Sequence, residues 1–72
     1  MNQEELEERI SQFIKNRYQQ KNESVSIRFI HIRFEVDEII IEQVLEKMVR
    51  SGIISKYYDE NFEEFRYKPK SE

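Results

Sequence analysis

The sequence holds few residues of the types that perform chemistry. His31 is the only histidine and there is no cysteine, so the side chains that dominate zinc sites are nearly absent. A glycine-rich phosphate loop cannot form, because Gly52 is the only glycine. A serine triad needs a histidine base, and the surrounding pattern places His31 on the packed face of a short helix. The sequence therefore predicts a protein that is not an enzyme and that uses no metal or cofactor.

Lysine and arginine side chains offer a different chemistry, which is the binding of anionic groups. Within residues 62–68, Arg66 and Lys68 alternate with aromatic residues, so both cations fall on one face of an extended strand. Such a strand can contact phosphates. The alternative, given equal weight, is an ordinary solvated edge, because the neighbouring Glu63 and Glu64 can neutralise these cations.

The net charge of −3 hides an uneven distribution along the chain. Residues 9–34 hold six cations and one acid, Glu23, whereas residues 35–64 hold nine acids and three cations. Such asymmetry influences which surfaces attract which partners. The first stretch favours an anionic partner and the second opposes one.

Apolar spacing predicts a long helix near the start of the chain and another in its second half. The first spans residues 2–20, where apolar residues recur every three or four positions and Asn2 can cap the helix. The other spans residues 38–51. Asp37 is its N-cap, and Gly52 follows its last turn, where glycine accepts a left-handed backbone.

The segment between these helices is ambiguous. Its β-branched and aromatic residues favour a strand, and residues 25–27 are predicted to form a very short one. Over residues 28–34, the apolar neighbours Phe29 and Ile30 break the alternation that a strand requires. The remaining apolar residues fit one face of a helix, so we expect a short helix there.

The last third of the chain predicts a β-hairpin. Residues 53–58 are β-branched and aromatic, residues 59–61 form a polar turn, and residues 62–68 form the returning strand. Pro69 ends that strand, because proline has no N–H to donate.

A chain of 72 residues makes one domain at most. We expect this domain to span residues 1–72, with frayed ends at residues 1–2 and 69–72. The longest apolar run, residues 39–41, is far shorter than the roughly 20 residues of a membrane helix. The start of the chain is rich in glutamate and does not fit a signal peptide. We expect a cytoplasmic protein with no membrane segment.

The order of these elements resembles the winged-helix superfamily of small bacterial, archaeal and viral regulators. The most specific similarity covers the third helix and the start of the hairpin, with the pattern Ile41-x3-Leu45-x2-Met48-x3-Gly52-Ile53-Ile54. A second similar stretch covers the second helix and its turn, with the pattern Ile27-x2-Ile30-His31-x2-Phe34-x-Val36-Asp37. The resemblance implies an α+β winged helix-turn-helix with three helices, a short first strand and a C-terminal two-stranded wing.

Two positions depart from the pattern of that family. Family members often have a small residue at the position of His31 and a glycine at the position of Glu35. We therefore expect the second helix and the turn after it to be distorted in this chain. We expect His31 to have a packing role and not to carry protons.

The resemblance implies that the domain binds double-stranded DNA and regulates transcription. Related proteins lay the third helix in the major groove, where Gln43 could read adenine, and Lys47 or Arg50 could contact guanine or phosphate. Three glutamates on or near that face oppose a polyanion, so we expect the wing and the second helix to contribute more. The candidate nucleic-acid-binding residues are Arg28, Arg33, Gln43, Lys47, Arg50, Lys56, Arg66 and Lys68.

Apolar residues predicted to point outward suggest a protein interface, either with a second copy or with another partner. A contiguous cluster of such residues marks an interaction site, and a homodimer would add burial to a small domain. The alternative function is a protein-interaction adaptor or inhibitor that uses the acidic third helix. If the helix phase differs, Phe29 and Ile32 belong to the core instead. The candidate interface residues are Phe29, Ile32, Ile39, Tyr57 and Tyr58.

Overall fold

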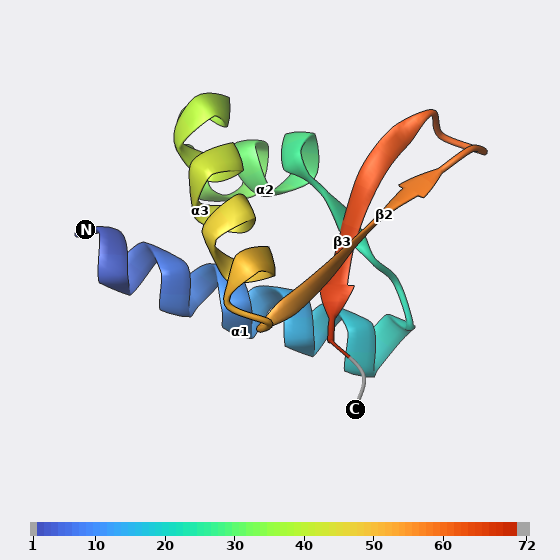
Figure 1. Ribbon diagram of the computed structural model, residues 1–72, viewed down its shortest axis with the longest axis horizontal. Helices are drawn as coiled ribbons and strands as arrows, with labels where there is room; N and C mark the ends of the chain where they lie inside the picture. Colours follow the sequence, from blue (N-terminus) through green and yellow to red (C-terminus); the bar gives the residue numbers. More distant parts are fainter. Residues whose placement is uncertain (1, 71–72) are drawn as a thin grey trace.

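The computed structural model describes residues 2–70, which form three helices and a three-stranded antiparallel sheet (Figure 1). This α+β architecture has the predicted elements in the predicted order, including a helix in the ambiguous segment. The ends expected to fray at residues 1, 71 and 72 lie outside the described residues. In chain order the elements are α1 (Gln3–Lys21), β1 (Val25–Ser26), α2 (Ile27–Phe34), α3 (Glu38–Arg50), β2 (Ile54–Asp59) and β3 (Glu64–Pro69).

Short polar side chains start each helix. The Asn2 side chain accepts a hydrogen bond from the Glu5 N–H at 2.8 Å, and Asp37 accepts one from the Ile39 N–H at 2.8 Å, as the sequence predicts. Ser26 plays the same part for α2, because its hydroxyl accepts from the Phe29 N–H. The helix therefore begins directly after β1, and the third residue of the expected strand is helical.

The α2 helix and its turn are regular, so the expected distortion is absent. The α2 helix has eight residues and ends at Glu35, whose φ of 56° and ψ of 43° are left-handed. The half-buried His31 ring donates from Nδ1 to the Val36 carbonyl oxygen at 2.6 Å, which ties the helix to the turn. Glu35 adopts a left-handed backbone conformation, which costs a glycine less conformational free energy than it costs a glutamate. The helix before Glu35 nevertheless remains regular.

The last strand in the chain is the middle strand of the sheet. The strand order is β1-β3-β2, and Tyr67 of β3 stands opposite both Val25 of β1 and Lys56 of β2. Pro69 is the last residue of β3 and pairs with Ile54, although the sequence placed it in a frayed end. The short β1 strand, which directly precedes α2, therefore belongs to the same sheet as the hairpin.

The hairpin turn is displaced from its expected position. Asp59 lies in β2 opposite Glu64, and the turn occupies residues 60–63. Phe62, expected in the returning strand, lies in this turn and is 66% exposed. Glu63 has a φ of 52°, so the chain reverses through a left-handed residue after Phe62. Aromatic residues favour strands, and this preference led to the wrong prediction for Phe62, which lies in the turn.

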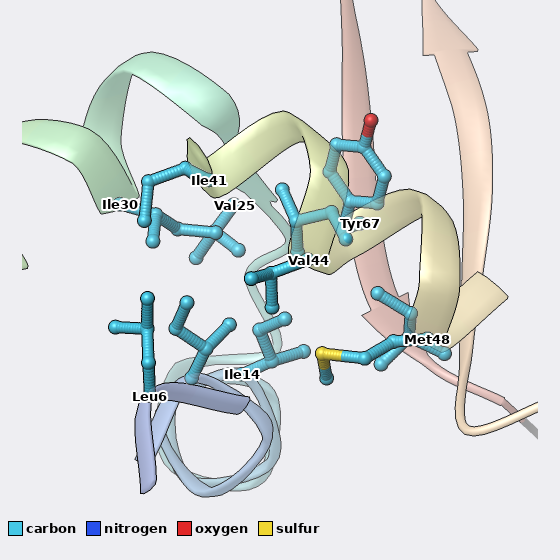
Figure 2. Close-up of a cluster of buried hydrophobic side chains, with 11 residues drawn as sticks. Leu6, Ile14, Val25, Ile30, Ile41, Val44, Met48 and Tyr67 are labelled. Carbon is cyan, nitrogen blue, oxygen red and sulfur yellow. The ribbon is translucent and has the colours of Figure 1, made fainter. Parts of the chain in front are cut away.

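A single apolar core lies between the three helices and the sheet (Figure 2). Ile30 of α2 and Ile41 of α3 approach the α1 residues from above, and Tyr67 brings the sheet against α3 (Figure 2). The core side chains follow the predicted helical spacing in α1, α2 and α3. The buried apolar residues are Leu6, Ile10, Ile14, Val25, Ile30, Ile41, Val44, Leu45, Met48, Ile54 and Tyr67.

Candidate binding surfaces

The outward face of α3 has fewer available cations than its sequence suggests. The Lys47 ammonium lies 3.2 Å from a carboxylate oxygen of Glu7 in α1, so it is turned toward the first helix. Gln43 and Arg50 stay exposed, and they line a shallow hollow of about 380 Å³ together with Ile39, Glu42 and Glu46. Arg50 is therefore the one cation that lines this hollow.

Lys56 of the hairpin is also neutralised from α3. Its ammonium lies 2.6 Å from the Glu46 carboxylate and 4.5 Å from the centre of the Phe65 ring. The hydrogen bond to Glu46 raises the pKa of Lys56 above its ordinary value, because the bond favours the charged ammonium. Lys56 thus joins the hairpin to α3, which differs from its expected role as a phosphate contact.

The hairpin divides the predicted cations between its two faces. Residues that alternate along a strand point to opposite sides of the sheet. Lys56 therefore shares a face with the buried Tyr67, whereas Arg66 and Lys68 lie on the other. The sequence placed Arg66 and Lys68 on one strand face, as the structure does, and the third candidate cation of the hairpin, Lys56, lies on the other face.

Tyr67 sits beneath the junction between α3 and the hairpin. Its side chain is fully buried, and its hydroxyl has no hydrogen-bond partner within residues 2–70. Burial raises the pKa of the Tyr67 hydroxyl, an effect that the nearby Lys56 ammonium opposes in part. The tyrosine contributes packing to this face, and its oxygen is sealed from the surface.

On the opposite face, Arg66 acts as a bridge between the hairpin and the segment before α2. Its guanidinium donates to the Ser24 hydroxyl at 2.8 Å, to the Ser24 carbonyl at 2.7 Å and to Glu64 at 2.7 Å. The Tyr57 hydroxyl also lies 2.6 Å from the Ser24 hydroxyl. Arg66 therefore positions this surface, and only part of its donor capacity remains for a ligand.

Cations stack on aromatic rings along this same side of the molecule. The Arg66 guanidinium lies 5.1 Å from the Phe62 ring centre, and the Lys68 ammonium lies 5.3 Å from that of Tyr57. On the helices, the Arg17 guanidinium lies 4.6 Å from the centre of the Phe29 ring. These distances are typical of cation–π contacts.

The helical stack continues from Phe29 across α1 and α2. The rings of Phe29 and Phe13 are stacked at 5.8 Å, and Phe13 meets Phe34 edge-to-face at 5.5 Å. The Arg33 guanidinium lies 5.9 Å from the Phe13 ring centre and 6.0 Å from that of Phe34. Phe29, expected to point outward, is thus half-covered by its neighbours and 38% exposed.

Two shallow hollows join the helical stack to the hairpin stack. A hollow of about 120 Å³ lies between Phe29 and Arg66, and one of about 290 Å³ lies between Arg66 and Tyr57. Ser24 lines both. We call the continuous surface the basic–aromatic band, and it consists of Phe13, Arg17, Ser24, Phe29, Arg33, Phe34, Tyr57, Phe62, Arg66 and Lys68.

Half of this band was absent from the predicted site. Phe13 and Arg17 lie four residues apart, so they share one side of α1, and this spacing is a signal that the sequence contains. Phe62 was assigned to a strand, and Ser24 lies between the predicted first helix and the predicted short strand. Their convergence depends on the pairing of β1 with β3, which no local pattern specifies.

The remaining predicted residues lie on α2, α3 and β2. Arg28 is exposed on α2, and Ile32 of the same helix is 65% exposed. Ile39 at the start of α3 is 66% exposed, and Tyr58 of β2 is 51% exposed and packs edge-to-face on Phe65 at 5.2 Å. These apolar residues point outward, as expected.

Other kinds of site find little support in the part of the chain that the structure describes. Within residues 2–70, no group of three or more histidine or acidic side chains is placed to hold a metal ion. None of the helices between residues 2 and 70 combines the length and apolarity that crossing a bilayer requires. No family model matches the sequence, and comparisons with curated proteins and with solved structures find no match.

Proposed function

We propose that this chain is a non-catalytic winged-helix module that binds nucleic acid through its basic–aromatic band. One observation carries the proposal. Four cations from α1, α2 and β3 each lie against an aromatic ring on one continuous surface. Cations supply the attraction to phosphates, and aromatic faces supply contacts to sugars and bases.

The charge on α3 supports this placement. An α3 helix in the major groove would bring Glu38 and Glu42 close to the phosphates, while Lys47 and Lys56 are already paired with glutamates. Carboxylates beside a polyanion oppose the counterion release that drives most nucleic-acid affinity. In contrast, Arg28, Arg33 and Lys68 form no ion pair among residues 2–70 and are available for phosphates.

A salt titration with paired variants tests the proposal. The double variant Arg33→Gln/Lys68→Gln removes two cations of the band and should weaken binding to a labelled DNA duplex of random sequence. It should also reduce the slope of log affinity against log salt by about one for each phosphate that the protein no longer neutralises. The control Lys47→Gln/Arg50→Gln removes two cations from α3 and should leave that slope unchanged.

The outcome separates the two surfaces. A slope that falls only in the α3 variant would place the nucleic acid on α3 and overturn the proposal. Failure of the folded protein to bind either a duplex or a single strand at about 50 mM salt and tens of micromolar concentration would overturn it as well.

A second candidate function is protein binding by the α3 side of the hairpin. Tyr58 and Phe65 are about half exposed there, Ile39 is exposed on α3, and the glutamates of α3 lie beside them. This surface suits a basic partner or the subunit contact of a homodimer. Ile39→Glu should then convert a dimer to a monomer on a sizing column, while the thermal midpoint stays nearly the same because Ile39 is exposed.

A further inference from the structure

We infer that the basic–aromatic band binds single-stranded nucleic acid in preference to a duplex. The inference rests on the proposed function and specifies the form of ligand that the band takes. Bases in a duplex are stacked inside the helix, whereas those of a single strand can be turned out onto aromatic rings or guanidinium planes. The exposed rings of the band can stack on bases only in the second case.

The exposure of the rings supports a stacking role. Phe62 lies at the tip of the hairpin and is 66% exposed, and Tyr57 next to it is 38% exposed. Tyr57 and Phe62 line the same hollow, together with Arg66 and Lys68. At 66% exposure, the Phe62 ring has apolar surface available for a base in addition to its contact with Arg66.

The charge of the band supports the same conclusion. Arg17 is paired with Glu23 at 3.1 Å, and Arg66 is paired with Glu64 at 2.7 Å. These carboxylates keep the local net charge low, which weakens the purely electrostatic contribution on which duplex binding depends. Stacking is insensitive to that neutralisation, so it becomes the larger share of the affinity for a strand with free bases.

The shape of the band fits an extended ligand. Its two hollows have volumes of about 120 and 290 Å³. They follow one another past Ser24, from the helical stack to the hairpin stack. A strand laid along them would meet Phe29 at one end and Phe62 at the other.

The test compares three labelled probes of about 20 nucleotides, namely oligo-dT, oligo-U and a duplex of mixed sequence. At low salt, the protein should bind a single strand at least about tenfold more tightly than the duplex. Comparison of oligo-dT with oligo-U shows whether the protein prefers single-stranded DNA or single-stranded RNA. The slope of log affinity against log salt should be shallow, at about 0.7 for each phosphate contact.

Matched variants locate the stacking. Phe62→Leu keeps an apolar side chain but removes the π-face, so it should lower the single-strand affinity by about five- to tenfold and leave duplex affinity unchanged. Phe65→Leu, on the opposite side of the hairpin, should bind as the unchanged protein does. Thermal unfolding of each variant confirms that it folds.

Three results would overturn the inference while leaving the proposed function intact. They are equal affinity for duplex and single strand, no effect of Phe62→Leu, or an equal effect of Phe65→Leu. A protein that binds none of the three probes overturns the proposed function itself. A loss of both duplex and single-strand binding in the Arg33→Gln/Lys68→Gln variant, with Phe62→Leu affecting only the single strand, supports both.

Discussion

The two sides of the hairpin use the same kinds of residue in different ways. On the α3 side, Lys56 pairs with Glu46 and lies against Phe65, and the buried Tyr67 closes the core beneath them. On the other side, Arg66 holds Ser24 and lies against Phe62 at an exposed turn. One side uses its cation to join elements within the fold, while the other leaves cations and rings accessible beside each other.

This difference shows why the position of a helix in a fold is a weak guide to binding. In the winged-helix proteins that the sequence resembles, the third helix reads DNA, yet Lys47 of α3 is directed to α1 in this chain. The accessible combination of charge and aromatic surface lies instead on α1, α2 and β3. Function must be argued from the surface, because a shared fold hosts many functions.

The largest effect that separates the two sides is expected from Arg66→Met. The change removes charged hydrogen bonds to the Ser24 hydroxyl, the Ser24 carbonyl and Glu64. The free energy of unfolding should fall by about 2–3 kcal/mol. Lys56→Met, which breaks one partly exposed ion pair with Glu46, should cost less than about 1 kcal/mol. Urea denaturation measures both, and equal losses would contradict the contrast.

The turn that joins α2 to α3 gives the next effect. Glu35→Gly should raise the free energy of unfolding by about 0.5–1 kcal/mol, because glycine adopts the observed left-handed backbone without strain. Lys15→Gly, within α1, should have the opposite sign and lower it by about 1 kcal/mol. Chemical denaturation distinguishes the signs. A destabilised Glu35→Gly protein would show that the glutamate side chain has a role that the structure does not record.

Alkaline pH should destabilise the α3 side of the hairpin. The pKa of Tyr67 lies above its usual 10.0 in the folded protein, so the unfolded chain releases this proton first as the pH rises. The pKa of Lys56 is likewise raised above 10.5, with the same consequence. The free energy of unfolding should therefore fall from about pH 10 upward.

Tyr67→Phe tests the source of this pH dependence. Removing the buried hydroxyl should flatten the decline between about pH 9.5 and 11 and leave the stability at neutral pH equal or slightly higher, because the hydroxyl has no partner within residues 2–70. Denaturant titrations at a series of pH values give the comparison. The same slope in both proteins would show that Tyr67 does not contribute.

The smallest effect is expected from a charge reversal on α3. Glu42→Lys should change nucleic-acid affinity by less than about threefold, because screened charges away from the contact surface act weakly. Fluorescence anisotropy at about 150 mM salt is sufficient to measure it. A gain of tenfold or more would bring α3 into the contact and weaken the distinction between the two sides.

Much of the fold could be predicted because its signals are local. Apolar residues at helical spacing specified all three helices, and short polar residues marked the starts of α1 and α3. The start of α2 was missed because Ser26 is both the last residue of a strand and a helix cap. The hairpin turn was missed because Phe62 has the composition of a strand residue but sits in a turn.

The candidate site was harder to predict because its contacts join residues far apart in the sequence. Lys47 meets Glu7 across 40 positions, and Arg66 meets Ser24 across 42. Neither pairing can be recognised from composition or periodicity, so the sequence does not show that Lys47 and Arg66 are already engaged within the fold. The placement of Lys56 and Arg66 on opposite faces of the hairpin could have been predicted, because side chains alternate between the two faces along paired strands.

The strand order has a consequence for how the chain folds as it is made. Residues 64–69 are synthesised after every element that they hold together, and β1 has no hydrogen-bonded neighbour in the sheet until they arrive. The helices can form early, because their contacts are local. The core nevertheless stays open at the place of Tyr67, with β1 and β2 both exposing unpaired backbone. Until β3 pairs with them, β1 and β2 therefore present unpaired backbone edges to which another chain can bind.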